Sequence, residues 1–483
     1  MNKKNLFTIA TGTLVGLLFF FRFYKLYEFV TFLSDQGRDA IILKRIITFE
    51  HFPAIGAPSS VGQVYLGPFY YYLVAPFLAL FRFDPVGPAF GVALISIVSI
   101  ITMYLIIKKE FSVFAAMVFL AMVTFSATLT EYSRFSWNPN LLPYFSFFTL
   151  YFYSLWLGKP TLRNGIIFGT LLGFSIQLHY LGSLLFLPMI FLFGYFLFLH
   201  KSIKPFIYSL FSAIVAFILS ISPLIIFDLR HNFLNARQFL ALFTEGGLSG
   251  GSAYYQRLFV TINNLFLHGL QIQSPIVISI FLFLIITASG YTAYRQSKST
   301  LILLHLLNLI FYILSFAFLG SMRLPHYYGP VILSLYLTVT VGIMIMQNNK
   351  FRVVLSIFIV ISMIFLNVPK MYYLFEKGNN QIQEAKNIAL SITKRIKKQP
   401  IQTIALPSIE SDGHYRYFLE VDGFILLPQD SPDQPDELYV ICQKTCNPTG
   451  DGQWQIAAFS NKFLDTQWNE ENVTIFKFIH KKI

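Results

Sequence analysis

Charge is scarce in this chain. Asp, Glu, Lys and Arg together make up 12% of its 483 residues, whereas hydrophobic residues make up 55%. Many apolar stretches approach the roughly 20 residues that a membrane-spanning helix needs. The composition therefore excludes a soluble protein and predicts a mainly α-helical, polytopic transmembrane bundle.

Cysteine is scarcer still, with Cys442 and Cys446 as the two examples. A lone C-x-x-x-C without partner histidines is weak evidence for a metal site, and a disulfide is favoured if the segment lies in an oxidising compartment. The sequence also lacks an internal repeat, a low-complexity tract and a glycine-rich phosphate loop. Nothing in it therefore indicates a P-loop nucleotide site.

Acidic residues are nearly absent from the apolar stretches, whereas basic residues give a net charge of +13. The basic residues fall in pairs between apolar runs, which indicates membrane topology rather than a nucleic-acid partner. With every such pair in the cytoplasm, the sequence predicts about eleven spans and an outer C-terminus. The predicted spans are 6–24, 86–107, 111–130, 139–157, 165–178, 182–199, 206–227, 274–293, 300–319, 329–346 and 352–368.

The stretch 67–85 decides this topology, because crossing there would move every later loop to the other side. Its uninterrupted apolar part covers only about 15 residues and contains Pro76, which is short for a span. We predict that it forms a juxtamembrane helix in the interface, bordering the lipid phase.

The composition changes near Met371, where the apolar runs end. The stretch 379–400 has helical periodicity, and 401–408, 413–428, 437–443, 453–460 and 473–479 are predicted as short strands between turns. The predicted domains are a transmembrane domain at 1–370, with outer loops 25–85 and 228–273, and an extracytoplasmic α/β domain at 371–483. Within the second loop, Gly246–Ser252 is predicted to be a flexible link.

The first predicted outer loop opens with SDQGRDAIILKRI, at residues 34–46. Asp35 is a candidate helix N-cap, or a base that receives a proton from an acceptor. Asp39 is either the ion-pair partner of Arg38 or a second ligand beside Asp35 for a divalent cation. Hard divalent cations require more oxygen ligands than this motif supplies, which counts against a cation at Asp35 and Asp39. The shared cation stays an alternative to the ion pair.

Other polar side chains are predicted to share the same outer face. Each has a structural alternative, since arginines near helix ends snorkel and histidines often only hydrogen-bond. Their functional alternative is binding of a substrate, either the donor or the acceptor of a transferred group, with guanidinium groups holding an anionic head group. The candidates are Tyr65, Tyr132, Arg134, Asn138, His179, Tyr180, Arg323, His326 and Tyr327.

These motifs resemble the GT-C superfamily of integral membrane glycosyltransferases. The acidic motif after the first helix, GPFYYY, the tyrosine-x-arginine motif at 132–134 and the RxxHY segment at 323–327 carry the resemblance. It is nearest to glycosyltransferase family 39, with its protein O-mannosyltransferases and aminoarabinose transferases. The likeness extends over roughly residues 1–350 in layout.

The resemblance implies a polyprenyl-phosphate-linked sugar donor and an extracytoplasmic active site in a multi-pass cell-membrane protein. The acceptor it implies is a lipid, a glycan or a protein. It also implies that Asp35 acts on the acceptor nucleophile in an inverting transfer, while Arg134 and Arg323 stabilise the leaving phosphate.

The chain departs from the family pattern twice. Trp137, Asn138 and Pro139 stand where many relatives have a second acidic residue, and Leu66, Gly67 and Pro68 stand where some have a lysine. The donor-phosphate contact of that lysine is then either missing or supplied from elsewhere, by Arg38 or Lys44. The alternatives to an enzyme are a flippase or other carrier of lipid-linked glycans and a noncatalytic membrane scaffold.

Overall fold

The computed structural model describes residues 3–59, 64–200, 202–244, 253–320, 323–407, 411–444 and 446–481. Contacts divide the chain into two compact units. The bundle unit comprises Met1–Tyr24, Ala54–Tyr70 and Val92–Phe375, and the α/β unit comprises Lys25–Pro53, Tyr71–Gly91 and Glu376–Ile483. The C-terminal segment therefore folds together with parts of the first predicted outer loop.

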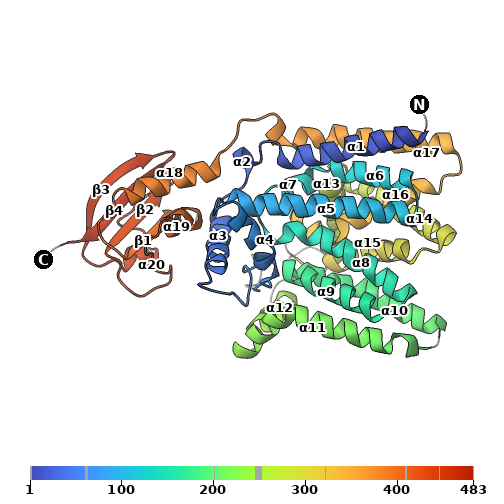
Figure 1. The fold of residues 1–483 in the computed structure, drawn as a ribbon, viewed down its shortest axis with the longest axis horizontal. Coiled ribbons are helices and arrows are strands. Elements are labelled where there is room, and N and C mark those ends of the chain that lie inside the picture. The colour runs from blue at the N-terminus through green and yellow to red at the C-terminus, as the bar shows by residue number, and fades with distance from the viewer. Residues whose placement is uncertain are drawn as a thin grey trace. The chain divides into compact units, whose positions relative to one another are not determined.

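The bundle unit is helical, as predicted. Its helices α1, α6, α16 and α17 run side by side (Figure 1). Helices α4 (Phe69–Leu80) and α5 (Val86–Glu110) begin in one unit and end in the other. The remaining α-helices of the bundle unit are α1 (Lys3–Phe23), α6 (Val113–Thr124), α7 (Ala127–Tyr132), α8 (Leu142–Gly158), α9 (Leu162–Leu178), α10 (Phe186–His200), α11 (Ile207–Arg230), α12 (Leu234–Thr244), α13 (Tyr254–Leu270), α14 (Ile276–Ser297), α15 (Thr300–Phe316), α16 (Gly329–Met344) and α17 (Asn349–Asn367).

Seven helical segments of the described chain are long and apolar enough to cross a membrane. They are Asn5–Phe23, Val86–Glu110, Tyr180–Leu199, Lys204–Arg230, Ile276–Ser297, Pro325–Met344 and Asn349–Lys370. Each coincides with one of the predicted spans. The other four predicted spans correspond to shorter helices, α6, α8, α9 and α15, so the count of about eleven stays a prediction.

Helix α4 forms within the stretch 67–85, which decides the topology. It has 12 residues with Pro76 inside it. At 1.5 Å per residue it is about 18 Å long, which is well short of the roughly 30 Å hydrocarbon layer. This length agrees with a helix that stays in the interface.

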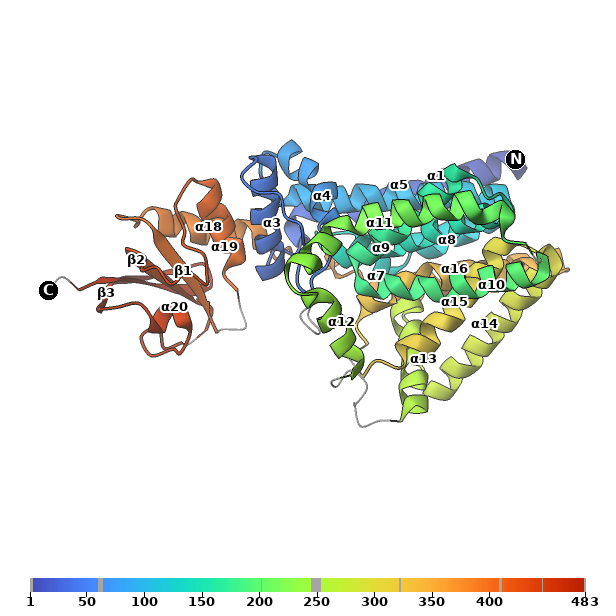
Figure 2. The same ribbon diagram turned by 90° about the horizontal axis from the view of Figure 1, so that it is seen from below.

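Glycines spaced four residues apart bring α9 and α11 together (Figure 2). A Cβ added to Gly165 or Gly169 would collide with the backbone oxygen of Ser209 or Ala213, and one added to Gly173 would collide with the hydroxyl of Ser220. Small residues at this spacing let helix backbones approach closely in a bilayer, where packing drives association.

The predicted outer loop at 228–273 contains helical structure that we did not predict. Helix α13 buries Thr261, Ile262, Leu265 and Phe266, at the spacing of one helical face. The predicted flexible link Gly246–Ser252 lies outside the described residues.

The α/β unit contains a four-stranded sheet of order β1-β2-β4-β3. Strands β1 and β2 are parallel, and β4 is antiparallel to both β2 and β3. Its elements are α2 (Leu26–Phe29), α3 (Ser34–Ile47), α18 (Gln381–Thr393), β1 (Ile401–Leu406), α19 (Gly413–Val421), β2 (Glu437–Cys442), α20 (Trp454–Ala457), β3 (Lys462–Glu470) and β4 (Val473–His480). The small C-terminal sheet domain and the helix before it are thus confirmed.

Two predicted strands are wrong. The stretch 413–428 begins with helix α19, and 453–460 contains helix α20. Both stretches are rich in aromatic and aliphatic residues with high strand propensity, but such propensity depends on packing partners. Strand β3 was not predicted, because its largely polar side chains are mostly exposed at the sheet edge.

The two faces of the sheet are covered by different elements. Leu438 and Val440 of β2 share a core cluster with Ile456 of α20. On the other side, Trp468 of β3 donates a hydrogen bond to Ser391 of α18 at 3.1 Å. A disulfide joins Cys442 and Cys446 at the end of β2, which confirms the favoured interpretation of the two cysteines.

Candidate functional site

The acidic motif lies on α3, in the α/β unit. The N-cap of this helix is Leu33, whose amide donates to the side chain of Gln36 at 3.2 Å. Asp35 therefore lies in the first turn, and the N-cap alternative for it is wrong. The carboxylate is 52% exposed, and a negative charge in a first turn is favoured by the helix dipole.

Arg38 lies between the two aspartates. Its Nη1 donates to Asp35 at 3.0 Å, while Nε and Nη2 donate to Asp39 at 3.0 and 2.8 Å. The predicted pairing of Arg38 with Asp39 is confirmed. One guanidinium is thus shared by two carboxylates, of which Asp35 is open to solvent and Asp39 is buried.

Asp39 is held by a third residue that sequence reasoning missed. Tyr71 of α4 donates its hydroxyl to the same Asp39 oxygen at 2.9 Å, whereas the other oxygen has no partner among the described residues. Burial raises the pKa of Asp39, and Arg38 and Tyr71 oppose that shift. The two contacts favour the charged form of Asp39, whereas burial, the larger effect, disfavours it.

A polar cleft opens beside this motif, between α3, α19 and the segment that follows α19. Within it, Arg45 forms an ion pair with Glu420 at 2.8 Å. The residues that line the cleft are Ser34, Asp35, Arg38, Ile41, Ile42, Arg45, Ser411, Gly413, Arg416, Glu420, Leu426, Pro428, Gln429 and Asp430.

Two glycines set the separation of the cleft walls. A Cβ on Gly37 of α3 would collide with the backbone of Gly413 and His414, at the start of α19. A Cβ on Gly413 would lie 2.8 Å from the carbonyl oxygen of Ser34. Glycine at both positions lets the two helices touch, which holds Asp35 against the cleft.

Several predicted residues of the bundle unit form one aromatic cluster. The ring of His326 lies 4.6 Å from Trp137, 5.9 Å from His179 and 6.3 Å from Tyr132, measured between centroids. His179 also stacks on Tyr180 at 4.3 Å and contacts Tyr327 at 5.5 Å. The structure thus brings together five of the predicted site residues.

Asn138 lies in the short helix η1 (Asn138–Leu141) and is fully buried. Neither its amide oxygen nor its amide nitrogen has a partner among the described residues. An amide buried in this way has its full hydrogen-bonding capacity available to a polar ligand or to water.

Arg134 is held by backbone carbonyl groups of the bundle unit. Its Nη1 donates to the carbonyl oxygens of Phe21 and Arg22, and its Nη2 donates to that of Tyr24 at 2.8 Å. The guanidinium also lies 3.7 Å from the ring centroid of Tyr373. These contacts cap the end of α1, and they leave few donors for a phosphate.

Arg323 and Tyr65 are likewise engaged in protein contacts. Arg323 donates to Thr261 at 3.0 Å and to the carbonyl oxygen of Leu319 at 2.7 Å. The backbone of Tyr65 exchanges two hydrogen bonds with the side chain of Asn235. Both residues therefore connect segments between the helices of the bundle unit to neighbouring helices.

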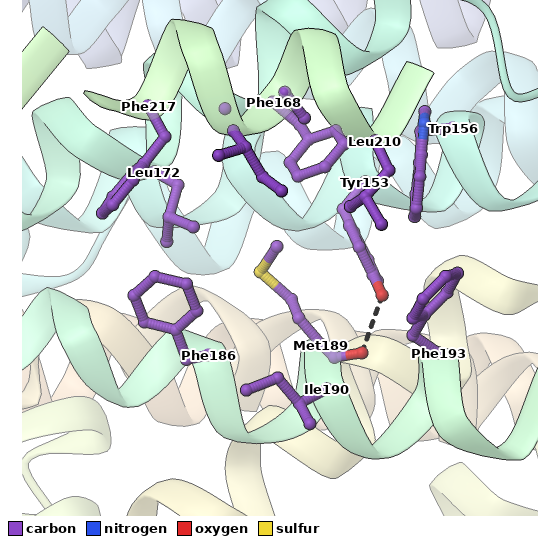
Figure 3. A pocket seen from close by; sticks show the side chains of 13 residues that line it. Tyr153, Trp156, Phe168, Leu172, Phe186, Met189, Ile190, Phe193, Leu210 and Phe217 are labelled. Atoms are coloured by element: carbon purple, nitrogen blue, oxygen red, sulfur yellow. Dashed lines mark hydrogen bonds between the residues drawn. The ribbon is translucent and has the colours of Figure 1, made fainter. Parts of the chain in front are cut away.

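An apolar pocket lies between α8, α9, α10 and α11 (Figure 3). The hydroxyl of Tyr153 points to the carbonyl oxygen of Met189 and donates to it at 2.7 Å, while rings such as Phe168 and Phe193 face the cavity. Such a lining suits an aliphatic chain and offers nothing to a sugar or a phosphate, so we do not assign the chemistry to it.

The residues do not fit the divalent cation considered for Asp35 and Asp39. Both carboxylates accept hydrogen bonds from Arg38, so a positive group already lies between them. In the described part of the chain, no group of three or more His, Cys, Asp or Glu side chains is placed to hold a metal ion. The mechanism proposed below therefore uses side chains alone.

Residues 66–227 match the family described as dolichyl-phosphate-mannose-protein mannosyltransferase. No curated protein matches the sequence. Solved structures similar to the chain include ArnT from Cupriavidus metallidurans bound to undecaprenyl phosphate, with 13% identity, a TM-score of 0.63 and coverage of 99% of this chain and 98% of ArnT. The same protein in the apo state gives 13% identity, a TM-score of 0.60 and 98% coverage of both chains.

The Archaeoglobus fulgidus oligosaccharyltransferase, solved in complex with Zn and sulfate, is also similar. It has 14% identity and a TM-score of 0.51, over 86% of this chain and 62% of that one. At these identities the likeness to solved structures is one of fold. The family match and the shared fold indicate a multi-pass membrane glycosyltransferase, and they confirm the resemblance to the GT-C superfamily.

Proposed function

We propose that this protein transfers a sugar from a polyprenyl-phosphate-linked donor to an acceptor hydroxyl on the extracytoplasmic side, with Asp35 as the base. The observation that carries the proposal is the half-exposed carboxylate of Asp35 at the edge of a polar cleft, fixed by Arg38 at 3.0 Å. A base needs both access to the hydroxyl and a fixed orientation, and this carboxylate has both.

In the proposed step Asp35 accepts the acceptor's hydroxyl proton. The acceptor oxygen forms a bond to the anomeric carbon while the bond from that carbon to the phosphate oxygen breaks, so the configuration inverts. The electron pair leaves with the polyprenyl phosphate. Arg38 is 33% exposed, and its nitrogen atoms already donate to Asp35 and Asp39. It therefore adds a positive charge beside the base, which acts on the developing negative charge through space.

Separate observations support the donor and the side of the membrane. The similar ArnT structure holds undecaprenyl phosphate, and the matched family is described by a dolichyl-phosphate sugar. A disulfide in the α/β unit is typical of an oxidising compartment outside the cytoplasm. The basic pairs in the predicted inner turns point to the same orientation.

The test is transfer of radiolabelled sugar in membranes supplied with a panel of polyprenyl-phosphate sugars. Asp35→Asn should lower transfer by at least about a hundredfold, as loss of a general base does, while Asp35→Glu should retain part of it. Asp433→Asn is the matched control, because Asp433 is an exposed carboxylate outside the cleft. Undiminished transfer by Asp35→Asn would reject Asp35 as the base.

A further inference from the structure

The apolar pocket between α8, α9, α10 and α11 takes no part in the proposed reaction (Figure 3). The polar atoms of its lining side chains are satisfied within the protein. The Tyr153 hydroxyl donates to the carbonyl oxygen of Met189 at 2.7 Å. The Trp156 indole donates to the Ser209 hydroxyl at 2.9 Å. The other side chains among the described lining residues are apolar, so the pocket offers its contacts to hydrocarbon.

The size and the opening of the pocket suit a lipid chain. Its volume is about 160 Å³, and an apolar cavity of roughly 150 Å³ stays dry and binds an apolar guest such as benzene. Ile190 of α10 and Ile214 of α11 line the pocket and are 65% and 48% exposed. Both helices belong to segments that are long and apolar enough to cross a membrane. The pocket therefore opens between α10 and α11 on a face that meets lipid.

The pocket lies toward one end of these helices. Along the helix axes, Trp156 is about 3 Å from the end of α8, Leu172 about 15 Å from the start of α9 and Phe217 about 15 Å from the start of α11. The starts of α9 and α11 lie side by side, since Gly165 packs on Ser209. One leaflet accounts for about half of the roughly 30 Å hydrocarbon layer. The pocket is thus at the depth of the acyl chains of one leaflet.

The aromatic cluster lies at the other ends of the same helices. His179 is the C-cap of α9, and Asn138 begins η1, directly before α8. With 17 residues, α9 is about 25 Å long. The pocket is therefore separate from the candidate site residues of the bundle unit.

Three basic side chains lie at the helix ends nearest the pocket. Lys159 is the C-cap of α8, Arg163 lies in the first turn of α9, and Lys204 begins η3 (Lys204–Phe206), directly before α11. All three are exposed, and none forms an ion pair within the described chain. Basic side chains at the end of a membrane helix attract anionic lipid head groups.

We infer that the pocket holds an acyl chain of a bilayer phospholipid with an anionic head group, which Lys159, Arg163 and Lys204 bind at the membrane surface. The apolar lining accounts for the chain, and the three uncommitted cations account for the sign of the head group. On the predicted topology this lipid belongs to the inner leaflet. The inference does not depend on the proposed sugar transfer.

Trp156 reports on the occupant, because bromine on an acyl chain quenches a tryptophan that it contacts. The full chain with Trp137, Trp454 and Trp468 replaced by Phe keeps Trp156 as its one tryptophan. It is reconstituted in phosphatidylcholine vesicles with increasing fractions of brominated phosphatidylglycerol or brominated phosphatidylcholine. We expect half-maximal quenching at about fivefold less phosphatidylglycerol, as attraction by basic residues predicts.

Equal quenching by the two brominated lipids would overturn the inference. Loss of the phosphatidylglycerol effect on adding an equal amount of unlabelled undecaprenyl phosphate would also overturn it, because the pocket would then hold a polyprenyl chain. Native mass spectrometry of the unaltered chain, which counts retained phosphatidylglycerol and phosphatidylcholine, repeats the comparison without substitutions. Retention of the two lipids in equal numbers there would contradict the head-group preference.

Variants of the basic residues test the head-group contact. Lys159→Gln combined with Lys204→Gln should remove most of the preference for phosphatidylglycerol. Lys108→Gln combined with Lys109→Gln removes the same charge at the end of α5, beside Glu110 and away from the pocket lining, and should leave the preference unchanged. An equal effect of the two pairs would refute the role of Lys159 and Lys204.

A variant of the opening tests the chain contact. Ile214→Phe narrows the opening and should reduce quenching of Trp156 by both lipids at least about twofold. Ile218→Phe is the matched control, because Ile218 is 46% exposed one turn along α11 and does not line the pocket. Equal quenching in the two variants would place the acyl chain outside the pocket and reject the inference. Sugar transfer is measured in none of these experiments, so their outcomes are independent of the result for Asp35→Asn.

Discussion

Gly37 of α3 and Gly413 of α19 touch backbone to backbone, although 376 positions separate them in the sequence (413 − 37). The contact belongs to the α/β unit, and it brings the turn that carries Asp35 against the C-terminal segment. Its two consequences are a lower stability of the unit when either glycine gains a side chain, and a displaced Asp35.

Gly37→Ala should destabilise the protein by about 1–3 kcal/mol, the usual cost of an overpacked contact. It should also lower sugar transfer, because α3 moves away from α19. Thermal unfolding in detergent and the transfer assay measure the two effects. Gly452→Ala is the control, since a Cβ at that position meets no atom within 4 Å. Equal stability of the two variants would contradict the close contact.

Tyr71→Phe removes the hydroxyl that donates to Asp39 at 2.9 Å. We expect a loss of about 1.5–3 kcal/mol of stability, the range for hydrogen bonds to charged groups, and reduced transfer because Arg38 and Asp35 are less well oriented. Tyr72→Phe is the neighbouring control. Its hydroxyl donates only to the backbone oxygen of Pro53, and its side chain is 40% exposed. A larger loss of transfer in Tyr72→Phe would argue against the role of Tyr71.

The stability of the α3–α19 contact should depend on pH through His414. Burial lowers the pKa of His414 from 6.5 to about 4, so the unfolded chain binds more protons between pH 4 and 6.5. The stability is therefore fully present above pH 6.5 and is lost as the pH falls through this window, by about 3 kcal/mol in all.

Hydrogen exchange of α3 and α19 at pH 4.5 and pH 7.5 measures this dependence. The amides should exchange faster from the folded state at the lower pH, after correction for the intrinsic exchange rate. His414→Gln lacks the titrating ring and should remove most of the difference. An unchanged pH dependence in that variant would assign the effect to another group.

Gly169→Val should disrupt the packing of α9 on α11, because the added side chain meets the carbonyl oxygen of Ala213. A loss of about 1–3 kcal/mol is expected for an overpacked helix contact, seen as a lower midpoint of thermal unfolding in detergent. Gly194→Val in α10 is the control, because a Cβ there meets nothing within 4 Å. If both variants unfold at the same temperature, the glycine spacing has no packing role.

The sequence predicted what depends on local composition. The apolar lengths predicted the helices at the eleven expected spans, but not α12 and α13 of the bundle unit. The short length of α4 followed from Pro76 and the polar residues around it. The pairing of Arg38 with Asp39 could also be predicted, since the two are adjacent in one helix. These features need no knowledge of distant partners.

What the sequence did not predict depends on contacts between distant segments. Tyr71 lies in the stretch predicted as an interfacial helix, and nothing near it in the sequence points to its hydrogen bond with Asp39. The stretch that forms α19 was predicted as a strand from the propensity of its residues. It is a helix because its burial against α3 decides its structure more than that propensity does. For Arg134 the sequence left a structural and a phosphate-binding role open, and its carbonyl partners near the end of α1 are contacts with a distant segment.

The α/β unit is assembled from three separate stretches, Lys25–Pro53, Tyr71–Gly91 and Glu376–Ile483. During synthesis the proposed base emerges early, but the helix and loop that complete its cleft are made only after the whole bundle unit. A nascent or truncated chain therefore carries Asp35 without the walls that would bind an acceptor. On the proposed function, the order of synthesis would then keep the protein inactive until the C-terminal segment has been made and folded.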